Sequence, residues 1–255
     1  MTRPHPIRLS VNVNKVATLR NSRGGAVPDV VEAARVCVAA GAGGITVHPR
    51  ADERHIRPDD VRALKAAFAD RWGPALEFNI EGDPRPDWLD LVCEVRPQQA
   101  TLVPVQPGEI TSHMGWSPRS DAALVEEAVA RLKQAGCRVS LFVDPDPSAI
   151  EWCAKRGADR VELYTEPYAR AFARGGTEAQ QSFERYAQAA RFAHSLGLGV
   201  NAGHDLDRDN LRLFRRLPHL AEVSIGHALI SDALFLGLEA TVRAYLAALH
   251  EEGTG

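Results

Sequence analysis

Short apolar, β-branched runs alternate along this chain with stretches of helical periodicity. The runs begin near Arg8, Gly44, Ala75, Gln99, Arg138, Arg160, Gly199 and Glu222. Each is followed by a segment with helical signals, and strands that alternate with helices predict a parallel sheet. Eight such units in 255 residues favour closure into a (β/α)8 TIM barrel over an open sheet. We therefore expect one catalytic domain that covers residues 1–255.

The predicted connections differ in length on the two faces of the barrel. Helix-to-strand connections are short, and glycines at positions 41, 136, 157 and 197 stand where a helix commonly ends in a left-handed residue. Three strand-to-helix connections are long: 14–28, 105–119 and 166–177. In a (β/α)8 barrel these connections lie at the C-terminal ends of the strands, the face on which active sites are built.

Composition and charge exclude several classes of partner. The formal net charge is −3 and no run of Lys or Arg occurs, so the sequence predicts no nucleic-acid partner. No apolar span of transmembrane length and no signal-like N-terminal core are found, so we expect a cytoplasmic protein without a membrane partner. The four cysteines are widely spaced without a Cys-x-x-Cys pair, which predicts neither a zinc site nor a redox dithiol.

Polar side chains collect near the ends of the predicted strands. They are Asn12, Asn14, His48, Arg50, Glu77, Asn79, Glu81, Asp144, Glu162, Thr165, Asn201, His204, Ser224 and His227. An unpaired carboxylate or imidazole inside a barrel is energetically costly, so this collection predicts a cavity that holds a substrate. For any single member, a place in a structural polar network is an equal alternative.

Two features predict phosphate binding. Gly-His pairs at 203–204 and 226–227 end the last two predicted strands, where barrels frequently hold a phosphate on backbone N–H groups. On the first long connection, Arg20 and Arg23 could hold a second phosphate with their guanidinium groups. Two solvated loop arginines are the alternative interpretation.

The titrating groups on three strands favour proton-transfer chemistry. His48, Glu77 and His204 suit repeated proton transfers at a carbonyl, because histidine titrates near neutral pH and burial can raise a glutamate pKa. No nucleophile elbow and no Walker-type phosphate loop is present. Two alternatives remain: a non-catalytic phosphate-binding barrel, and a metal-dependent barrel hydrolase or isomerase. The second lacks a His-x-His pair on the first strand, and we predict no metal site.

Five segments carry a resemblance to a known family. They are NVNKVATLRNSRG (12–24), GITVHPR (44–50), RHI (54–56), VNAGH (200–204) and IGHA (225–228). Together they resemble the pyridoxine 5'-phosphate synthase family, over nearly the whole chain. The resemblance implies a (β/α)8 barrel that assembles as a homo-octamer and needs no metal or organic cofactor. It also implies condensation of 1-deoxy-D-xylulose 5-phosphate with 3-amino-2-oxopropyl phosphate, which yields pyridoxine 5'-phosphate, phosphate and water.

The resemblance also implies roles for individual residues, carried over position by position. His48 and Glu77 would be acid/base residues, His204 a proton donor, and Glu162 a stabiliser of the transition state. The residues implied for the amino-ketone phosphate are Asn12, Arg23, Gly226 and His227. The residues implied for the pentulose phosphate are Arg50, His55 and Thr111.

The chain departs from the best-known family pattern in two places. Asn14 and Lys15 stand where that pattern has Asp-His, and Asp205 stands where it has Gly after the last catalytic histidine. The chain is thus similar to a second branch with Asn-x-Asn-Lys and Glu-Pro-Tyr at 166–168. The first exchange makes the rim of the first strand more positive by about two charges at neutral pH. We therefore predict substrate contacts for all three residues, with Lys15 at a phosphate or at the substrate carbonyl; a solvated Lys15 is the alternative.

Overall fold

The computed structural model describes residues 6–105 and 114–250 and contains a closed barrel of parallel strands. The strands pair in sequence order and β1 closes the barrel against β8. Their bounds are β1 (Arg8–Asn12), β2 (Gly44–Val47), β3 (Glu77–Gly82), β4 (Gln99–Leu102), β5 (Arg138–Val143), β6 (Arg160–Tyr164), β7 (Gly199–Gly203) and β8 (Leu220–Ile225). The (β/α)8 barrel predicted from the sequence is confirmed.

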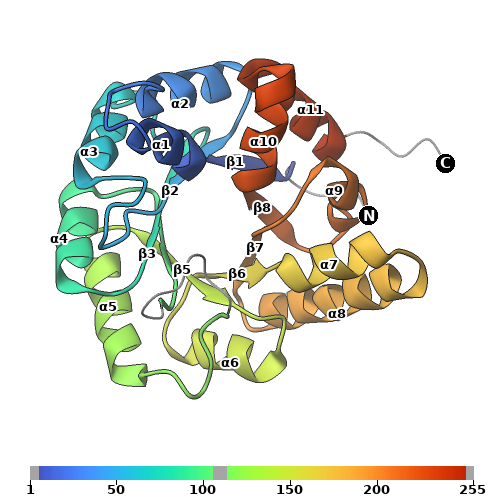
Figure 1. Ribbon diagram of the computed structural model, residues 1–255. Helices are drawn as coiled ribbons and strands as arrows, with labels where there is room; N and C mark the ends of the chain where they lie inside the picture. The colour runs from blue at the N-terminus through green and yellow to red at the C-terminus, as the bar shows by residue number, and fades with distance from the viewer. Residues whose placement is uncertain (1–5, 106–113, 251–255) are drawn as a thin grey trace.

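Helices form the outer layer of the barrel. They are α1 (Asn14–Asn21), α2 (Val30–Ala39), α3 (Pro58–Ala67), α4 (Pro86–Val95), α5 (Ala122–Gln134), α6 (Pro147–Lys155), α7 (Glu166–Arg174), α8 (Gly176–Ser195), α9 (Arg208–Phe214), α10 (His227–Leu236) and α11 (Leu238–His250). Figure 1 looks along the barrel and shows α1 and α10 inside the outer ring, beside the barrel opening. Over residues 6–105 and 114–250, no helix has the length and apolar character required to span a membrane.

Two of the three long connections expected as loops contain helices. α1 occupies much of the first and α7 most of the third. Only Val16, Ala17 and Arg20 are buried in α1, and Tyr168 and Ala171 in α7, so neither helix has an apolar stripe long enough to be recognised by periodicity. Helix ends elsewhere follow the sequence: the glycines at 41, 136, 157 and 197 have φ values of +108°, +86°, +80° and +81°. These are left-handed conformations that glycine adopts without a steric penalty.

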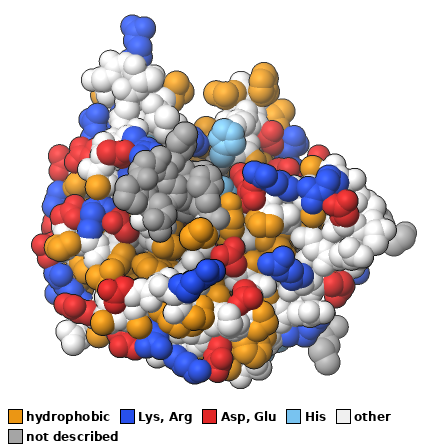
Figure 2. Space-filling model, turned by 60° about the horizontal axis from the view of Figure 1, so that its bottom comes forward, with side chains coloured by type: hydrophobic (Ala, Val, Ile, Leu, Met, Phe, Trp, Pro, Cys, Tyr) orange, Lys and Arg blue, Asp and Glu red, His pale blue; other side chains and the backbone are white. Residues whose placement is uncertain are grey.

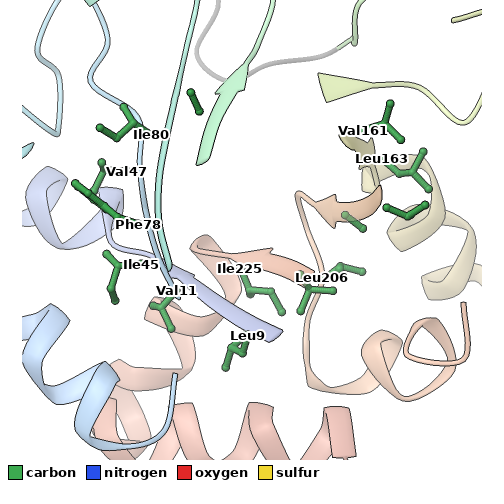
Figure 3. Packing of buried hydrophobic residues seen from close by; sticks show 14 of the residues in the cluster. Leu9, Val11, Ile45, Val47, Phe78, Ile80, Val161, Leu163, Leu206 and Ile225 are labelled. Carbon is green, nitrogen blue, oxygen red and sulfur yellow. The ribbon is translucent and has the colours of Figure 1, made fainter. Parts of the chain in front are cut away.

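Side chains alternate in direction along each strand, which separates an apolar layer outside the barrel from a polar layer inside it. Outward-facing side chains such as Phe78 pack against the helices, and Figure 3 shows members of this core around the strands. The inside of the barrel is polar. Ser10 Oγ and Thr46 Oγ1 lie 2.7 Å apart, and Thr101 Oγ1 donates to Asn79 Oδ1 at 2.9 Å. Many barrels fill this space with branched apolar residues, so the polar interior distinguishes this chain.

Ion pairs fill the N-terminal end of the barrel interior. Arg8 Nη1 lies 2.6 Å from Glu77 Oε2 and 3.3 Å from Glu222 Oε2. Arg138 Nη2 lies 2.5 Å from the same Glu77 oxygen. Burial, and then the charge of Glu77, raises the pKa of Glu222 to about 8. Glu77 therefore lies between two arginines at this end of the barrel.

Candidate active site

A cavity of about 530 Å³ lies at the C-terminal end of the barrel. Its lining comes from strand ends and the connections that follow them. The lining residues are Asn12, Asn14, Lys15, Thr18, His48, Arg50, Arg54, His55, Glu81, Val103, Phe142, Glu162, His204, Asp205, Ser224, Gly226 and His227. Figure 2 shows histidine side chains beside a hollow in the surface. Most of the site residues predicted from the sequence are thus brought together.

Of the predicted site residues that the structure describes, Glu77 and Arg23 do not line this cavity. Glu77 begins β3 at the opposite end of the barrel, where its carboxylate pairs with Arg8 and Arg138, and it does not line the cavity; its acid/base role stays a prediction. Glu81, farther along the same strand, lies in the cavity instead. Arg23 lies on an exposed segment after α1 and does not line the cavity. Thr111 lies outside the described residues.

Arg20 has a structural role in place of the phosphate contact considered from the sequence. Its side chain is buried and its Nη1 and Nη2 donate to Asp60 Oδ1 and Oδ2 at 2.5 and 2.8 Å. Hydrogen bonding to Asp60 raises the pKa of Arg20. Nη2 also donates to the backbone oxygen of His55 at 3.3 Å. Arg20 therefore fixes α1 to α3 and to the segment that carries His55.

One side of the cavity is cationic. Lys15, Arg50, Arg54 and His55 line it together. The backbone N–H of Ile56 donates to Nδ1 of His55 at 2.9 Å, so the imidazole proton resides on Nε2. Burial, followed by the positive groups around it, lowers the pKa of His55 to about 3. His55 is therefore a neutral N–H donor among positive side chains, a combination that suits a phosphate.

A strained turn after β7 presents His204 to the cavity. His204 and Asp205 have φ values of +88° and +59°, in the left-handed region that non-glycine residues rarely adopt. The hydroxyl of Thr165 donates to the backbone oxygen of Gly203 at 2.7 Å and to that of His204, which holds the turn. Asp205 Oδ2 lies 3.1 Å from His204 Nδ1, and this hydrogen bond lowers the pKa of Asp205. Asp205 thus orients the imidazole.

Two carboxyl groups, those of the largely buried Glu81 and the buried Glu162, line the cavity together with the histidines. Glu81 Oε2 lies 3.7 Å from His48 Nδ1 and accepts a hydrogen bond from Asn12 Nδ2 at 3.4 Å. Burial raises the pKa of Glu81 to about 7; burial and then the charge of Glu81 raise the pKa of Glu162 well above its ordinary value. A Cβ on Gly203 would lie 2.3 Å from Glu162 Oε1, so glycine makes room for this side chain. Carboxyl groups tuned in this direction can take and give protons near neutral pH.

Asn14 joins the ends of the first two strands. Its backbone N–H donates to Asn12 Oδ1 at 3.0 Å, and its side-chain Oδ1 accepts from the backbone N–H of His48 at 3.0 Å. Through this second contact the side chain of Asn14 positions the backbone of His48.

The second Gly-His pair lies where α10 begins. A Cβ on Gly226 would lie 3.1 Å from Asn12 Cβ and 3.2 Å from its backbone oxygen, so the close approach of β8 to β1 requires glycine. His227 is the first residue of α10, whose early N–H groups have no partner within the helix. Such a helix end, beside the cavity, is suited to an anion.

The sequence matches the family model described as "Pyridoxal phosphate biosynthesis protein PdxJ" over residues 9–251. The chain therefore belongs to the PdxJ family. A curated pyridoxine 5'-phosphate synthase from Porphyromonas gingivalis is 54% identical over 239 residues, which cover 93% of this chain and 97% of that relative. Another curated pyridoxine 5'-phosphate synthase, from Xanthomonas campestris pv. campestris, is 55% identical, and the alignment covers 94% of this chain and 94% of that relative.

Solved structures share the fold of this PdxJ family member at low sequence identity. Phosphoribosyl anthranilate isomerase from Thermus thermophilus aligns with a TM-score of 0.57 at 18% identity, over 95% of this chain and 98% of that one. A mutant tryptophan synthase alpha-subunit from Pyrococcus furiosus aligns with a TM-score of 0.62 at 13% identity, over 96% and 97%. These similarities concern the barrel alone.

Several lining residues of the PdxJ barrel had no role in the sequence analysis. Arg54 had a signal, since it adjoins His55 in a family segment; its Nη2 lies 2.6 Å from Asp52 Oδ2. Val103 and Phe142 had none, because they are apolar residues in apolar runs. Both are buried in a small cluster with Tyr164, so they give the cavity a low-dielectric wall that strengthens nearby electrostatic interactions.

Proposed function

We propose that this PdxJ family member is a pyridoxine 5'-phosphate synthase that joins 1-deoxy-D-xylulose 5-phosphate and 3-amino-2-oxopropyl phosphate. The observation that carries the proposal is the meeting, in one cavity, of a cationic side with a set of imidazole and carboxyl groups. Curated relatives with this name, more than half identical over nearly their whole length, support the same reaction. Two phosphate dianions do not cross a bilayer unaided, so the proposed location is the cytoplasm.

Two groups of lining residues suit two phosphates. Lys15, Arg50 and His55 provide charge and an N–H donor for the pentulose phosphate. Gly226 and His227 at the start of α10 suit the amino-ketone phosphate. With both phosphates held, the reactive carbonyl and amino groups are held within the same cavity as the acid/base groups.

Ring formation requires a C–N bond, a C–C bond and the loss of water and phosphate, and hence several proton transfers. His48 and His204 line the cavity and are the proposed imidazole acids and bases. Glu162 is buried beside them with a raised pKa, so its protonated form can donate a hydrogen bond to developing negative charge. Asp205 orients His204.

The decisive experiment is synthesis by the purified protein. It is incubated with both phosphates, and pyridoxine 5'-phosphate and released inorganic phosphate are measured. Reactions that lack either substrate serve as controls. Absence of product under conditions in which a known synthase works would contradict the proposal, and binding of the two phosphates without product would favour a non-catalytic barrel.

A chelation experiment tests the metal-dependent alternative. In residues 6–105 and 114–250 no group of three or more His, Cys, Asp or Glu side chains is placed to hold a metal ion. Loss of activity on chelation would favour the metal-dependent alternative.

Replacing Lys15 with methionine is expected to raise the KM for the pentulose phosphate. Lys15 lines the cavity and its charge contributes to the lowered pKa of His55. At a separation of about 6 Å and an effective dielectric near 20, one charge pair is worth roughly 3 kcal/mol before screening. We expect about 1–2 kcal/mol to remain at a hydrated rim, or about a tenfold higher KM.

Ionic strength distinguishes this contact from a bystander. Added salt should reduce the difference in KM between Lys15→Met and the original protein. Lys155→Met, which removes an exposed lysine paired with Glu151 on α6, is the matched control and should leave KM unchanged. An unchanged KM for Lys15→Met at low and high salt would remove Lys15 from the phosphate site.

A homo-oligomer, an octamer by family resemblance, is the proposed assembly. Leu234, Phe235 and Leu236 at the end of α10 are 71%, 89% and 48% exposed. Figure 2 shows hydrophobic side chains that project from the surface beside the hollow. Contiguous exposed apolar side chains of this size are common at interfaces between subunits.

Phe235→Glu is expected to reduce the mass of the assembly in solution. A charge placed at the centre of an apolar contact must be desolvated there, at a cost of several kcal/mol. Light scattering after size-exclusion chromatography measures the mass directly. Leu124→Glu, on α5 at the other side of the barrel, replaces a less exposed apolar residue and is the control. An unchanged mass for Phe235→Glu would place the subunit interface elsewhere.

A further inference from the structure

The connection from β3 to α4 is a rigid segment near the cavity. Its residues 83–86 read Asp-Pro-Arg-Pro, and each proline restricts the residue before it to extended backbone. Arg85 has φ of −75° and ψ of 152°, and its backbone N–H donates to the backbone oxygen of Asp83 at 2.8 Å. Trp88, which is 1% exposed, donates from Nε1 to the backbone oxygen of Glu81 at 2.9 Å. These restraints fix the backbone from which the side chain of Arg85 extends.

The guanidinium group of Arg85 reaches the connection that follows β2. Its Nη2 donates to the backbone oxygen of Pro49 at 2.8 Å. Its Nη1 donates to Asp83 Oδ1 at 2.5 Å, and its Nε to Asp87 Oδ2 at 3.0 Å. The side chain is 18% exposed. Because the guanidinium group is planar, two carboxylates and one carbonyl hold it in a single orientation.

The carbonyl of Pro49 belongs to a segment that carries two cavity residues. Pro49 lies beyond the end of β2, outside the pairing of the strands, and stands between His48 and Arg50, which both line the cavity. From the connection after β1, Asn14 holds this segment through the backbone N–H of His48 at 3.0 Å. From the connection after β3, Arg85 holds it through the carbonyl of Pro49. β1 and β3 both pair with β2, so the segment is fixed from each neighbouring strand.

A cleft of about 410 Å³, formed by the connection after β2 and by α3 and α4, adjoins the cavity at Arg50. α3 and α4 are neighbours in the outer layer of the barrel (Figure 1). Arg50 lines both the cleft and the cavity. Arg85 lines the cleft, whereas the described lining of the cavity does not include it. Its route to the cavity is therefore the backbone of Pro49.

We propose that Arg85 is a positioning residue that holds Arg50 at the pentulose phosphate through the carbonyl of Pro49. The inference rests on the proposed function, which places Arg50 at that phosphate. With the hydrogen bond to Pro49 in place, the backbone that carries Arg50 is fixed, and its guanidinium group is preorganised for the phosphate oxygens. Without this hydrogen bond the backbone must be ordered on binding, which weakens affinity. His48 keeps its contact with Asn14, so the effect on binding exceeds the effect on proton transfer.

The test measures binding and turnover of Arg85→Met. The KM for 1-deoxy-D-xylulose 5-phosphate, and its dissociation constant from calorimetry, should rise about tenfold. kcat and the KM for 3-amino-2-oxopropyl phosphate should stay within about threefold. Arg85→Lys keeps the positive charge but replaces the planar fork with one ammonium group, so its affinity should remain at least about threefold below the original. Arg62→Met is the control, because Arg62 lines the same cleft and pairs with Glu94 at 2.8 Å, and this variant should bind normally.

A double-mutant cycle with Arg50 separates positioning from a general structural effect. In an Arg50→Met background, Arg85→Met should weaken binding of the pentulose phosphate by less than about twofold, because the group that Arg85 positions is absent. A full tenfold loss in that background would overturn the inference. Unchanged binding by a folded Arg85→Met variant would do the same, as would complete recovery in Arg85→Lys, which would assign the effect to charge alone. If Arg85→Met fails to fold, the same cycle with Arg85→Lys decides.

Binding and synthesis separate this inference from the proposed function. If the original protein binds the pentulose phosphate but makes no pyridoxine 5'-phosphate, the proposed function fails, and the binding cycle still decides the role of Arg85. If it makes the product and the cycle shows no coupling between Arg85 and Arg50, the function stands and the inference is wrong. A protein that does not bind the pentulose phosphate would contradict both.

Discussion

Replacing His204 with asparagine is expected to lower kcat by about 100-fold or more while the protein stays folded. His204 presents an imidazole to the cavity from a turn held by Thr165, and Asp205 orients it. Asparagine lacks a group that titrates near neutral pH. It does tolerate the left-handed conformation that the backbone has at this position, with φ of +88°. The loss should therefore reflect chemistry more than strain.

Steady-state kinetics and circular dichroism of the same samples test this expectation. His194→Asn on α8 is the matched control: it removes an exposed histidine whose ring stacks on His219 at 3.7 Å, and it should leave kcat within about twofold. Asp205→Asn should lower kcat by roughly tenfold, an effect between those of His204→Asn and His194→Asn. The imidazole remains in this variant but loses its anionic partner. Near-normal turnover of His204→Asn would remove this histidine from the mechanism.

The fold could be predicted because its signal is repeated and local. Eight apolar runs separated by helical segments determine the barrel, and strand starts were placed within a few residues, with β3 and β8 displaced by two positions each. Glycines before strands marked helix ends because a positive φ is a local requirement. α1 and α7 escaped recognition because each buries only a few side chains.

The sequence does not indicate at which end of the barrel a polar residue of a strand lies. A period of two places Glu77 and Glu81 on the same side of β3, and nothing local indicates which one lines the cavity. The distinction depends on partners from distant segments: Arg8 and Arg138 for Glu77, and His48 for Glu81. Arg20 and Arg23 lie on the same predicted connection, and the sequence does not separate their roles. The ion pair of Arg20 with Asp60, a residue of a distant segment, does.

The protonation state of His55 illustrates a second limit. The resemblance implied a phosphate contact, and the cavity lining includes His55. That its imidazole is a neutral donor follows only from the backbone N–H of Ile56 bonded to Nδ1 and from burial. Sequence can name the residue type, whereas tautomer and charge arise from packing.

Glu77→Gln is expected to destabilise the protein by about 2–3 kcal/mol. Removing one member of a buried ion pair commonly costs about 3–5 kcal/mol because its partner is left uncompensated. The Glu77 side chain is 4% exposed and contacts Arg8 and Arg138, which are 23% and 31% exposed. Both arginines therefore retain some water, and each keeps a second partner, Glu222 and Gln99 respectively. These contacts place the expected loss below that of a fully buried pair.

Thermal and denaturant unfolding measure this loss, which should lower Tm by about 5–10 °C for a chain of this size. The matched control is Glu94→Gln, which breaks a two-bond ion pair with Arg62 on the surface, where the side chains are 54% and 47% exposed. Exposed pairs contribute at most about 1 kcal/mol, so this variant should unfold close to the original protein. Equal stabilities for the Glu77 and Glu94 variants would show that the arginines at the N-terminal end of the barrel do not depend on Glu77, and would leave the presence of a buried carboxylate there without a structural reason.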